Sequence, residues 1–319
     1  MKDLAPLPDL AIVIVTYNSA DEIEACLAAS RPEAQTVVIV DNASKDTSAQ
    51  WATIANARNV GFAAAVNQGI AATSEPLILI LNPDCRLKGG GLPAMTALFD
   101  DPTVGAAGGL LLYPSGHPDG HPDGQPQTGF AVRRFPTWAN QVCELAGINR
   151  LWPGNPLNCG YRCLDLDLTQ EQDVDQPAGA FLMVRRTAWE QLGGFDENFY
   201  PVWFEDVDFC YRLKQSGWRI RFTPKAKATH AGGHSVNKLS WRCKQMHWYG
   251  SLLRYAAKHW SGRGERRVAL ALFLVCIPRG VIGTLKRSSL EPLVVYAKLA
   301  GQAWRAFTRR QRVGRRAVN

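Results

Sequence analysis

The chain has 319 residues, 46% hydrophobic and 20% charged, which excludes a disordered protein and fits one large domain or a domain with an appendage. The net charge of +8 comes from the C-terminal tail: residues 262–319 hold 13 Lys and Arg against two acids, and the rest is slightly acidic. Because the tail mixes its cations with apolar residues, we expect no nucleic-acid partner.

The eight cysteines show no zinc or disulfide spacing, which favours reduced thiols. The N-terminus lacks the apolar segment of a secretory signal. The longest apolar run, 268–277, ends at Pro278 and is shorter than the ~20 residues that a bilayer span needs. We therefore expect a protein that stays on the cytoplasmic side.

The first hundred residues alternate between short β-branched runs and helical segments. This spacing predicts an α/β protein with a mostly parallel sheet flanked by helices. Strands are expected at 10–15, 36–40, 76–81 and 104–112, and helices at 19–29, 46–51, 62–72 and 92–99.

Residues 113–175 interrupt the alternation with the near repeat HPDG-HPDG, several prolines and little periodicity. We interpret this segment as a variable insertion or acceptor loop over the sheet. The α/β pattern then resumes, with a strand expected at 178–184 and helices at 187–191 and 206–216. The boundary of the catalytic domain is placed at residue 237, and 238–319 is predicted to be an aromatic and basic amphipathic helical extension.

Polar residues follow three of the predicted strands: Thr16, Tyr17 and Asn18, then Asp41 and Asn42, then Asn82 and Asp84. The carboxyl ends of neighbouring parallel strands form one crevice, so these residues predict a ligand site. Neither GxGxxG nor GxxxxGK[ST] is present, which disfavours dinucleotide and P-loop sites. The carboxylate of Asp41 could accept the N3–H of uracil or thymine, or could simply cap a turn. Asp84 could bind a hard divalent metal together with a diphosphate, although NPD is also an ordinary turn.

Three acids occur within four positions of an aromatic segment, Glu205, Asp206 and Asp208. Crowded carboxylates in an apolar setting favour the raised pKa of a general base. Asp208 and Arg212 are four residues apart on the predicted helix, and we interpret them as a structural pair.

Taken in order, several fragments resemble inverting glycosyltransferases of family two with the GT-A fold, and among them bacterial rhamnosyltransferases. The resemblance runs from about residue 10 to 237. It is carried by VIVTYNS (13–19), DNAS (41–44), NVGFAAAVNQGI (59–70), LNPD (81–84), PAGAFLMVRR (177–186) and GGFDENFYPVWFEDVDFCYRLKQSGW (193–218).

The resemblance implies a role for each matching residue. Asp206 would be the catalytic base, with Glu205 beside it as the alternative. Asp84 would bind Mg²⁺ or Mn²⁺; Asn82 stands where many members have Asp. His230 falls where relatives place a histidine near the metal, and His234 could substitute for it. Asp41 would read the pyrimidine. Gly61 and Asn67 belong to the donor side, and the sugar and acceptor pocket includes Gly179, Ala180, Trp203 and Phe204.

The implied reaction is a single displacement from a nucleotide-diphospho-sugar to a hydroxyl of a lipid-linked or cell-envelope glycan. dTDP-rhamnose is the expected donor, and a UDP-sugar that supplies galactofuranose or another hexose is the alternative. A sugar nucleotidyltransferase would carry a Gly-rich, Arg-bearing loop after the first strand, which TYNSADE does not match. A non-catalytic nucleotide-sugar-binding module is the third hypothesis.

The tail has apolar stretches at 268–285 and 293–307 interleaved with Arg and Lys. Basic amphipathic helices of this kind bind anionic membrane surfaces. We therefore expect the protein to attach peripherally to the inner face of the cell membrane; helices that only pack against the protein are the alternative.

Overall fold

The computed structural model describes residues 5–233, 238–260 and 262–309. The chain forms two compact units. The sheet unit consists of the described residues up to Phe135 and from Cys159 to Leu239, and the helical unit consists of those in 136–158 and from Ser240 onward. Residues 136–158, part of the segment interpreted as one insertion, thus belong with the C-terminal helices.

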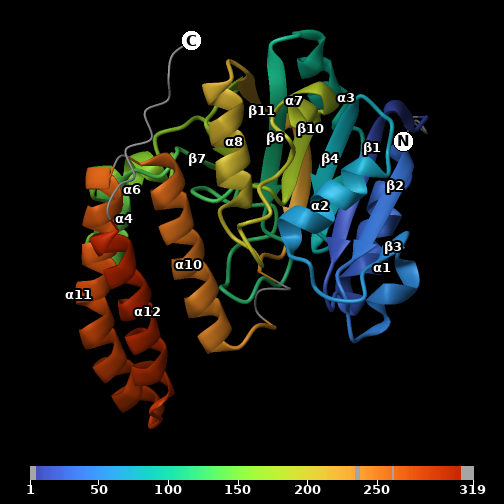
Figure 1. Cartoon of the computed structure of the whole chain (residues 1–319). Coiled ribbons are helices and arrows are strands. Elements are labelled where there is room, and N and C mark those ends of the chain that lie inside the picture. The colour runs from blue at the N-terminus through green and yellow to red at the C-terminus, as the bar shows by residue number, and fades with distance from the viewer. Residues whose placement is uncertain (1–4, 234–237, 261, 310–319) are drawn as a thin grey trace, which may run out of the picture. The chain divides into compact units, whose positions relative to one another are not determined.

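The sheet unit is built on a nine-stranded sheet with the order β3-β2-β1-β4-β10-β6-β11-β5, and β8 pairs with β11 (Figure 1). The strands are β1 (Leu7–Thr16), β2 (Ala34–Asp41), β3 (Ile54–Ala55), β4 (Leu77–Leu81), β5 (Cys85–Lys88), β6 (Val104–Leu112), β8 (Gln172–Asp173), β10 (Phe181–Arg185) and β11 (Arg219–His230).

Strand direction changes across this sheet. β1, β2, β3 and β4 are parallel, whereas β10 enters antiparallel between β4 and β6. β11 runs parallel to β6, and β5 and β8 pair with it antiparallel. The sheet is therefore mixed, and its parallel part is the half predicted from strand–helix alternation.

The central strands of the sheet are buried on both sides because helices cover both faces. Leu10, Ile12 and Ile14 of β1 join one apolar cluster, whereas Val13 and Val15 join the other. α1 (Ala20–Ser30) packs into the first cluster, and α2 (Phe62–Ala71) and α8 (Glu205–Gln215) pack into the second. The remaining helices of the regions predicted to alternate are η1 (Thr47–Trp51), α3 (Leu92–Thr96), η2 (Ala97–Asp100) and α7 (Arg186–Gln191).

Residues 113–175 contain regular structure that the sequence does not predict. They form α4 (Trp138–Leu145), α5 (Ile148–Leu151), α6 (Pro156–Tyr161), and β7 (Val132–Arg133), which pairs with β9 (Gln176–Pro177). The expectation of a loop is wrong here for a physical reason. α5 and α6 are too short for a hydrophobic period, and α4 begins with a Thr137–Asn140 capping box in place of the usual Glu or Gln.

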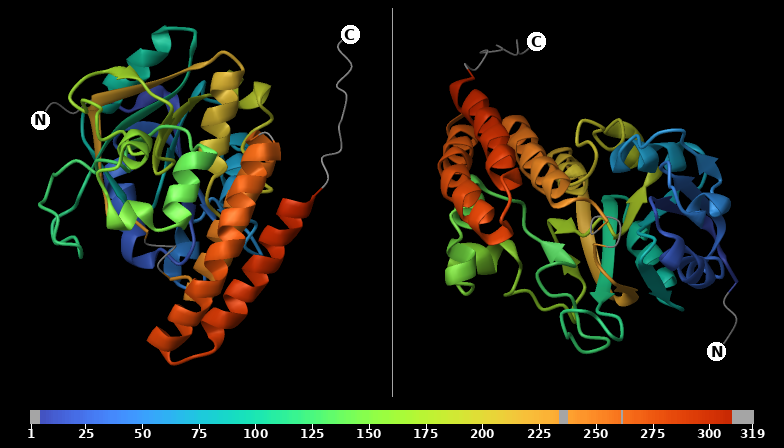
Figure 2. Two further views of the ribbon diagram at one scale, coloured as in Figure 1. Left: turned by 90° about the vertical axis from the view of Figure 1, so that its left-hand side faces the viewer. Right: turned by 90° about the horizontal axis from the view of Figure 1, so that it is seen from below.

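The helical unit contains α4, α5, α10 (Trp241–His259), α11 (Gly262–Arg287) and α12 (Glu291–Thr308). α11 and α12 pack side by side and are joined by residues 288–290 (Figure 2). α11 continues through Pro278, so the helix is longer than the apolar run at 268–277. Among the described residues, α11 alone is long and apolar enough to cross a membrane, judged by length and composition.

Candidate active site

Asp41 lies at the end of β2, opposite Thr16 at the end of β1, because the parallel register pairs these residues. One carboxylate oxygen of Asp41 accepts hydrogen bonds from the hydroxyls of Thr16 at 2.9 Å and Ser44 at 2.5 Å. The other oxygen accepts the backbone N–H of Ser44 at 2.9 Å. This buried network fixes the orientation of the carboxylate at the edge of the sheet.

Asn18 joins the first strand end to the same turn. Its backbone N–H donates to Ser44 Oγ at 2.8 Å, and its side-chain oxygen accepts the N–H of Lys45 at 2.7 Å. Asn18 has a φ of 53°, a left-handed conformation that asparagine tolerates better than most residues. Tyr17 lies next to it and is partly exposed.

The segment before α2 is tied to the second strand end. Asn42 accepts the backbone N–H of Val60 at 2.8 Å through its side-chain oxygen. Gly61 follows with a φ of 92°, and a Cβ there would lie 2.9 Å from Tyr200 Cδ2, so this turn requires glycine.

The amide of Asn67 is occupied by protein partners. Its oxygen accepts from Trp189 Nε1 at 3.1 Å and from the backbone N–H of Phe195 at 2.9 Å. Its nitrogen donates to the carbonyl of Phe195 at 2.9 Å and to Glu197 at 3.1 Å. Asn67 thereby attaches α2 to the turn before α8, and its predicted contact with a donor stays a prediction.

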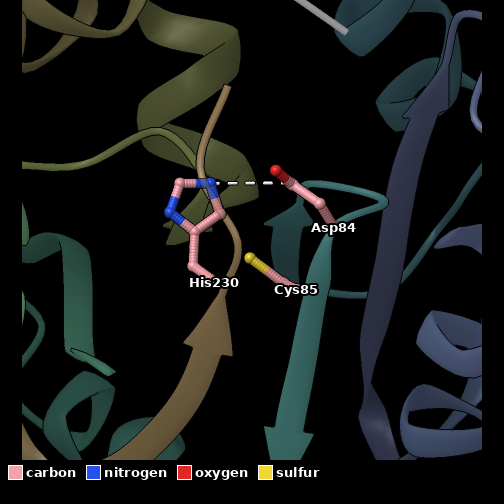
Figure 3. Close-up of side chains that lie close together, drawn as sticks. All are labelled: Asp84, Cys85 and His230. Carbon is pink, nitrogen blue, oxygen red and sulfur yellow. Dashed lines mark ion pairs between the residues drawn. The ribbon is translucent and has the colours of Figure 1, made fainter. Parts of the chain in front are cut away.

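Asp84, Cys85 and His230 come together where the turn between β4 and β5 meets the end of β11 (Figure 3). The antiparallel register places His230 opposite Cys85, and His230 Nε2 lies 3.5 Å from Asp84 Oδ1. Burial raises the pKa of Cys85 well above its ordinary value, and its thiol donates to the carbonyl of Ala180 at 3.3 Å. Because the Cys85 thiol is engaged with a backbone carbonyl, the buried carboxylate and imidazole are the pair that fits a hard divalent cation.

The imidazole of His230 is held on two sides by the segment before β7. Gln127 Oε1 lies 3.2 Å from His230 Nδ1, and the ring of Phe130 stacks on the imidazole with centroids 5.2 Å apart. Burial lowers the pKa of His230, opposed by the nearby charge of Asp84. The alternative histidine, His234, lies outside the described residues.

The carboxylate of Asp206 is hydrogen-bonded by residues of the segment before β10. Its Oδ2 accepts the backbone N–H of Gly179 at 3.0 Å and the amide of Gln176 at 3.2 Å. Asp206 keeps some exposure to solvent. Its pKa is raised by desolvation, against the opposing effect of the Gly179 N–H and of Arg133. A partly exposed carboxylate with a raised pKa suits a general base.

Glu205 has a different environment from its neighbour. It is 5% exposed, and its pKa is raised well above the ordinary value by desolvation and by repulsion from Asp206 and Asp208. Burial and the neighbouring carboxylates therefore both favour the protonated form of Glu205. Of the two predicted acids, only Asp206 keeps partial exposure to solvent.

The backbone before α8 is strained. Trp203 and Phe204 have φ values of 79° and 72°, which are rare for aromatic residues and typical of functional sites. Phe204 is buried and Trp203 is partly exposed. On α8 itself, Asp208 pairs with Arg212 at 2.8 Å, and Arg212 also donates to the carbonyl of Gly194, so this pair is structural as expected.

Two consecutive residues connect the candidate base to the candidate metal site. The N–H of Gly179 binds Asp206, while the carbonyl of Ala180 accepts the N–H of Asn82 at 3.0 Å and the thiol of Cys85. The sheet unit thus brings three separate sequence motifs, 82–84, 179–180 and 205–206, to one place.

Sequence reasoning missed Gln127, Gln176 and Arg133, although each lies beside a predicted site residue. All three fall in or next to the segment interpreted as an insertion, where no motif marks them. The only available signal was position, since Gln176 directly precedes PAGAF.

The amino-acid sequence is similar to those of known glycosyltransferases. A family model described as glycosyltransferase like family 2 matches residues 8–250. The N-acetylglucosaminyl-diphospho-decaprenol L-rhamnosyltransferase of Mycobacterium tuberculosis is 29% identical over 252 residues, which cover 72% of this chain and 78% of that protein.

Two solved structures show the same fold at 15% identity. TarS of S. aureus in complex with UDP-GlcNAc has a TM-score of 0.53 over 93% of this chain and 81% of its own. GalNAc-T7 with UDP, GalNAc and Mn²⁺ has a TM-score of 0.51 over 72% of this chain and 44% of its own. The predicted GT-A-like α/β fold is confirmed, and the chain belongs to the glycosyltransferase-like family 2.

Proposed function

We propose that this glycosyltransferase moves rhamnose from dTDP-rhamnose onto a hydroxyl of a lipid-linked or cell-envelope glycan. The similarity to a mycobacterial rhamnosyltransferase whose name specifies a lipid-diphosphate-linked sugar supports this donor and acceptor. A UDP-linked galactofuranose or other hexose is the alternative, because the Asp41 carboxylate can accept the N3–H of either thymine or uracil. The observation that carries the proposed transfer chemistry is the pair of hydrogen bonds by which Gly179 and Ala180 join Asp206 to the 82–85 turn.

Asp206 is the proposed general base. In an inverting transfer, the acceptor hydroxyl attacks the anomeric carbon opposite the leaving nucleoside diphosphate and loses its proton to a carboxylate. The raised pKa of Asp206 brings it closer to neutral pH, and its partial exposure gives an acceptor access to it. Glu205, the alternative base, would serve instead as a neutral neighbour. This single displacement requires no covalent nucleophile on the enzyme.

Asp84 and His230 are the proposed ligands of Mg²⁺ or Mn²⁺. When bound, the cation would neutralise charge that develops on the departing diphosphate. An imidazole ligand favours Mn²⁺ over Mg²⁺, because Mg²⁺ prefers oxygen. A solved transferase of the same fold that holds Mn²⁺ with UDP is consistent with this choice.

The donor nucleotide is proposed to bind along the strand ends. Among the described residues, Asp41 receives three hydrogen bonds from Thr16 and Ser44, and a carboxylate has about four acceptor positions. The remaining position would read the pyrimidine. Five residues around it complete the proposed donor side: Tyr17, Asn18, Asn42, Gly61 and Asn67. Trp203 and Phe204 would line the sugar and acceptor pocket with Gly179 and Ala180.

The helical unit is proposed to attach the enzyme to an anionic membrane surface on its cytoplasmic side. Leu270, Leu274, Ile277, Val281 and Leu285 form one exposed stripe along α11 at helical spacing, reaching 75% exposure at Leu285. The opposite face of α11, which includes Leu272 and Cys276, is buried within the unit.

Two further features favour attachment in the plane of the membrane over a span. Exposed cations lie at both ends of α11, at Arg263, Arg266, Lys286 and Arg287. Arg279, in the middle of the helix, donates to the hydroxyl of Tyr249 and to the carbonyl of Leu145. A helix with one covered face and basic ends matches an interfacial helix.

A donor screen tests the proposed function. Purified protein is titrated by calorimetry with dTDP-rhamnose, UDP-galactofuranose, UDP-glucose and GDP-mannose, each with Mg²⁺, Mn²⁺ or EDTA. Products formed on a lipid-diphosphate-linked acceptor are then identified by mass spectrometry. The proposal expects metal-dependent transfer from dTDP-rhamnose above the other donors. Preference for a UDP-sugar would support the alternative, and transfer from GDP-mannose alone would contradict both.

A further inference from the structure

The buried side chain of Gln127 adjoins His230 without taking part in the proposed chemistry. Gln127 is 3% exposed and precedes β7 in the segment interpreted as an insertion. Its backbone N–H donates to the carbonyl of Leu111 at 2.9 Å, and its carbonyl accepts the N–H of Ala131 at 2.9 Å. The side chain therefore projects from a fixed backbone.

The hydrogen bonds of Gln127 determine which end of its amide faces the histidine. The amide nitrogen lies 2.6 Å from the carbonyl oxygen of His230 and 3.3 Å from that of Leu112. Only an NH₂ group can face two carbonyl oxygens favourably, because the reversed amide would place three acceptors together. Gln127 Oε1 is thus the atom that lies 3.2 Å from His230 Nδ1.

This orientation assigns the proton on the imidazole. An amide oxygen can only accept, so Nδ1 of His230 must carry the hydrogen. In the neutral ring, Nε2 then holds the lone pair, and it lies 3.5 Å from Asp84 Oδ1. Two acceptor atoms facing each other repel unless a proton or a cation lies between them. The stacked ring of Phe130 also restrains the imidazole plane.

We propose that Gln127 is a positioning residue that fixes the Nδ1–H tautomer of His230 and so presents Nε2 with Asp84 as a ready pair of ligands for a divalent cation. The inference rests on the proposed metal site. It assigns to the variable segment a part in building that site, since metal-binding histidines commonly donate their second N–H to a neighbouring acceptor.

The first test reads the tautomer in metal-free protein. Long-range ¹H–¹⁵N correlation spectra distinguish protonated from unprotonated ring nitrogens, and His230→Gln identifies the signals of His230 among the six histidines. We expect a protonated Nδ1 and an unprotonated Nε2. A protonated Nε2 in the native protein would overturn the proposal, and this result needs no Gln127 variant to fold.

The second test measures Mn²⁺ affinity by electron paramagnetic resonance in the presence of dTDP and, separately, of UDP. Gln127→Met keeps the side-chain length, and we expect it to weaken Mn²⁺ binding about 10–100-fold, as loss of a partner of a metal-ligating histidine typically does. Gln141→Met is the matched control, because Gln141 is also 3% exposed but lies on α4 in the helical unit. Unchanged Mn²⁺ affinity in a folded Gln127→Met protein would refute the positioning role. Failure of the native protein to bind Mn²⁺ would instead contradict the proposed metal site. The tautomer spectrum would then still show whether Gln127 fixes the Nδ1–H form of His230.

Discussion

Gly179 leaves room for the carboxylate of Asp206, and Gly179→Ala perturbs the candidate base without changing its chemistry. The added Cβ would lie 2.9 Å from Asp206 Cβ and 3.0 Å from its Oδ2, closer than ordinary contact. Gly179 is not among the residues with positive φ, so alanine fits its backbone. The strain therefore falls on Asp206, which must move by a few tenths of an ångström.

The size of the effect follows from that displacement. Overpacking of this kind costs about 1–3 kcal/mol of stability. A misplacement of about 1 Å can lower a rate about 10²-fold, so a smaller shift should lower kcat about 10-fold, or about 1.4 kcal/mol in the barrier. The Gly179 N–H also opposes the raised pKa of Asp206, and weakening this hydrogen bond should raise that pKa further. The acidic limb of the kcat/KM profile should then move to higher pH.

Transfer kinetics across a pH series provide the assay, with thermal unfolding as a check on folding. Gly105→Ala is the matched control: its Cβ would lie 2.9 Å from Trp218 Cβ and 3.1 Å from Leu213, near the other end of α8. It should lose stability but keep the native pH profile. A native profile and rate in folded Gly179→Ala, or an equal loss of rate in Gly105→Ala, would refute the reasoning.

Three other perturbations have defined outcomes. Asp84→Ala should weaken binding of dTDP or UDP in calorimetry only when Mg²⁺ or Mn²⁺ is present; equal affinity of the native protein with and without EDTA would exclude metal-dependent binding. Because the folded pKa of Glu205 lies above its unfolded value, ionisation of Glu205 opposes folding as pH rises. The melting temperature of Glu205→Gln should therefore exceed that of the native protein by more at about pH 8 than at about pH 5. A difference in melting temperature that does not depend on pH would contradict the raised pKa. Replacing Leu274 and Ile277 by Glu should reduce flotation with anionic vesicles, whereas Leu164→Glu, an exposed leucine of the sheet unit, should not; equal flotation of both would leave α11 as a packing helix.

The N-terminal half of the sheet could be predicted because its strands are short β-branched runs followed by polar ends. β1 and β4 are buried on both faces, so their composition alone marks them as strands. The same logic predicts the positions of Asp41 at the end of β2 and of Asp84 in the turn after β4. It did not reveal β11, whose Pro and Lys residues resemble a loop, or the antiparallel entry of β10, because alternation does not encode strand direction.

The parts of the site that escaped prediction depend on contacts between distant segments. Gln127 reaches His230 across 103 positions, and Gln176 reaches Asp206 across 30. Neither glutamine belongs to a motif, and a glutamine side chain by itself does not indicate a position beside a functional carboxylate or imidazole. Pro278 usually ends a helix but lies inside α11, which therefore covers the whole predicted apolar stretch at 268–285.

The central claim is that Asp206 removes the proton from the acceptor during sugar transfer, and one comparison tests it most directly. Transfer to the lipid-linked acceptor and calorimetric donor affinity are measured for the native protein, Asp206→Asn and Glu205→Gln. Asparagine keeps the size of aspartate but cannot take a proton, so Asp206→Asn should bind the donor normally while transfer falls by ~10²-fold or more. Glu205→Gln should retain most of the transfer rate. Near-native transfer in Asp206→Asn together with its loss in Glu205→Gln would contradict the account and assign the base to Glu205.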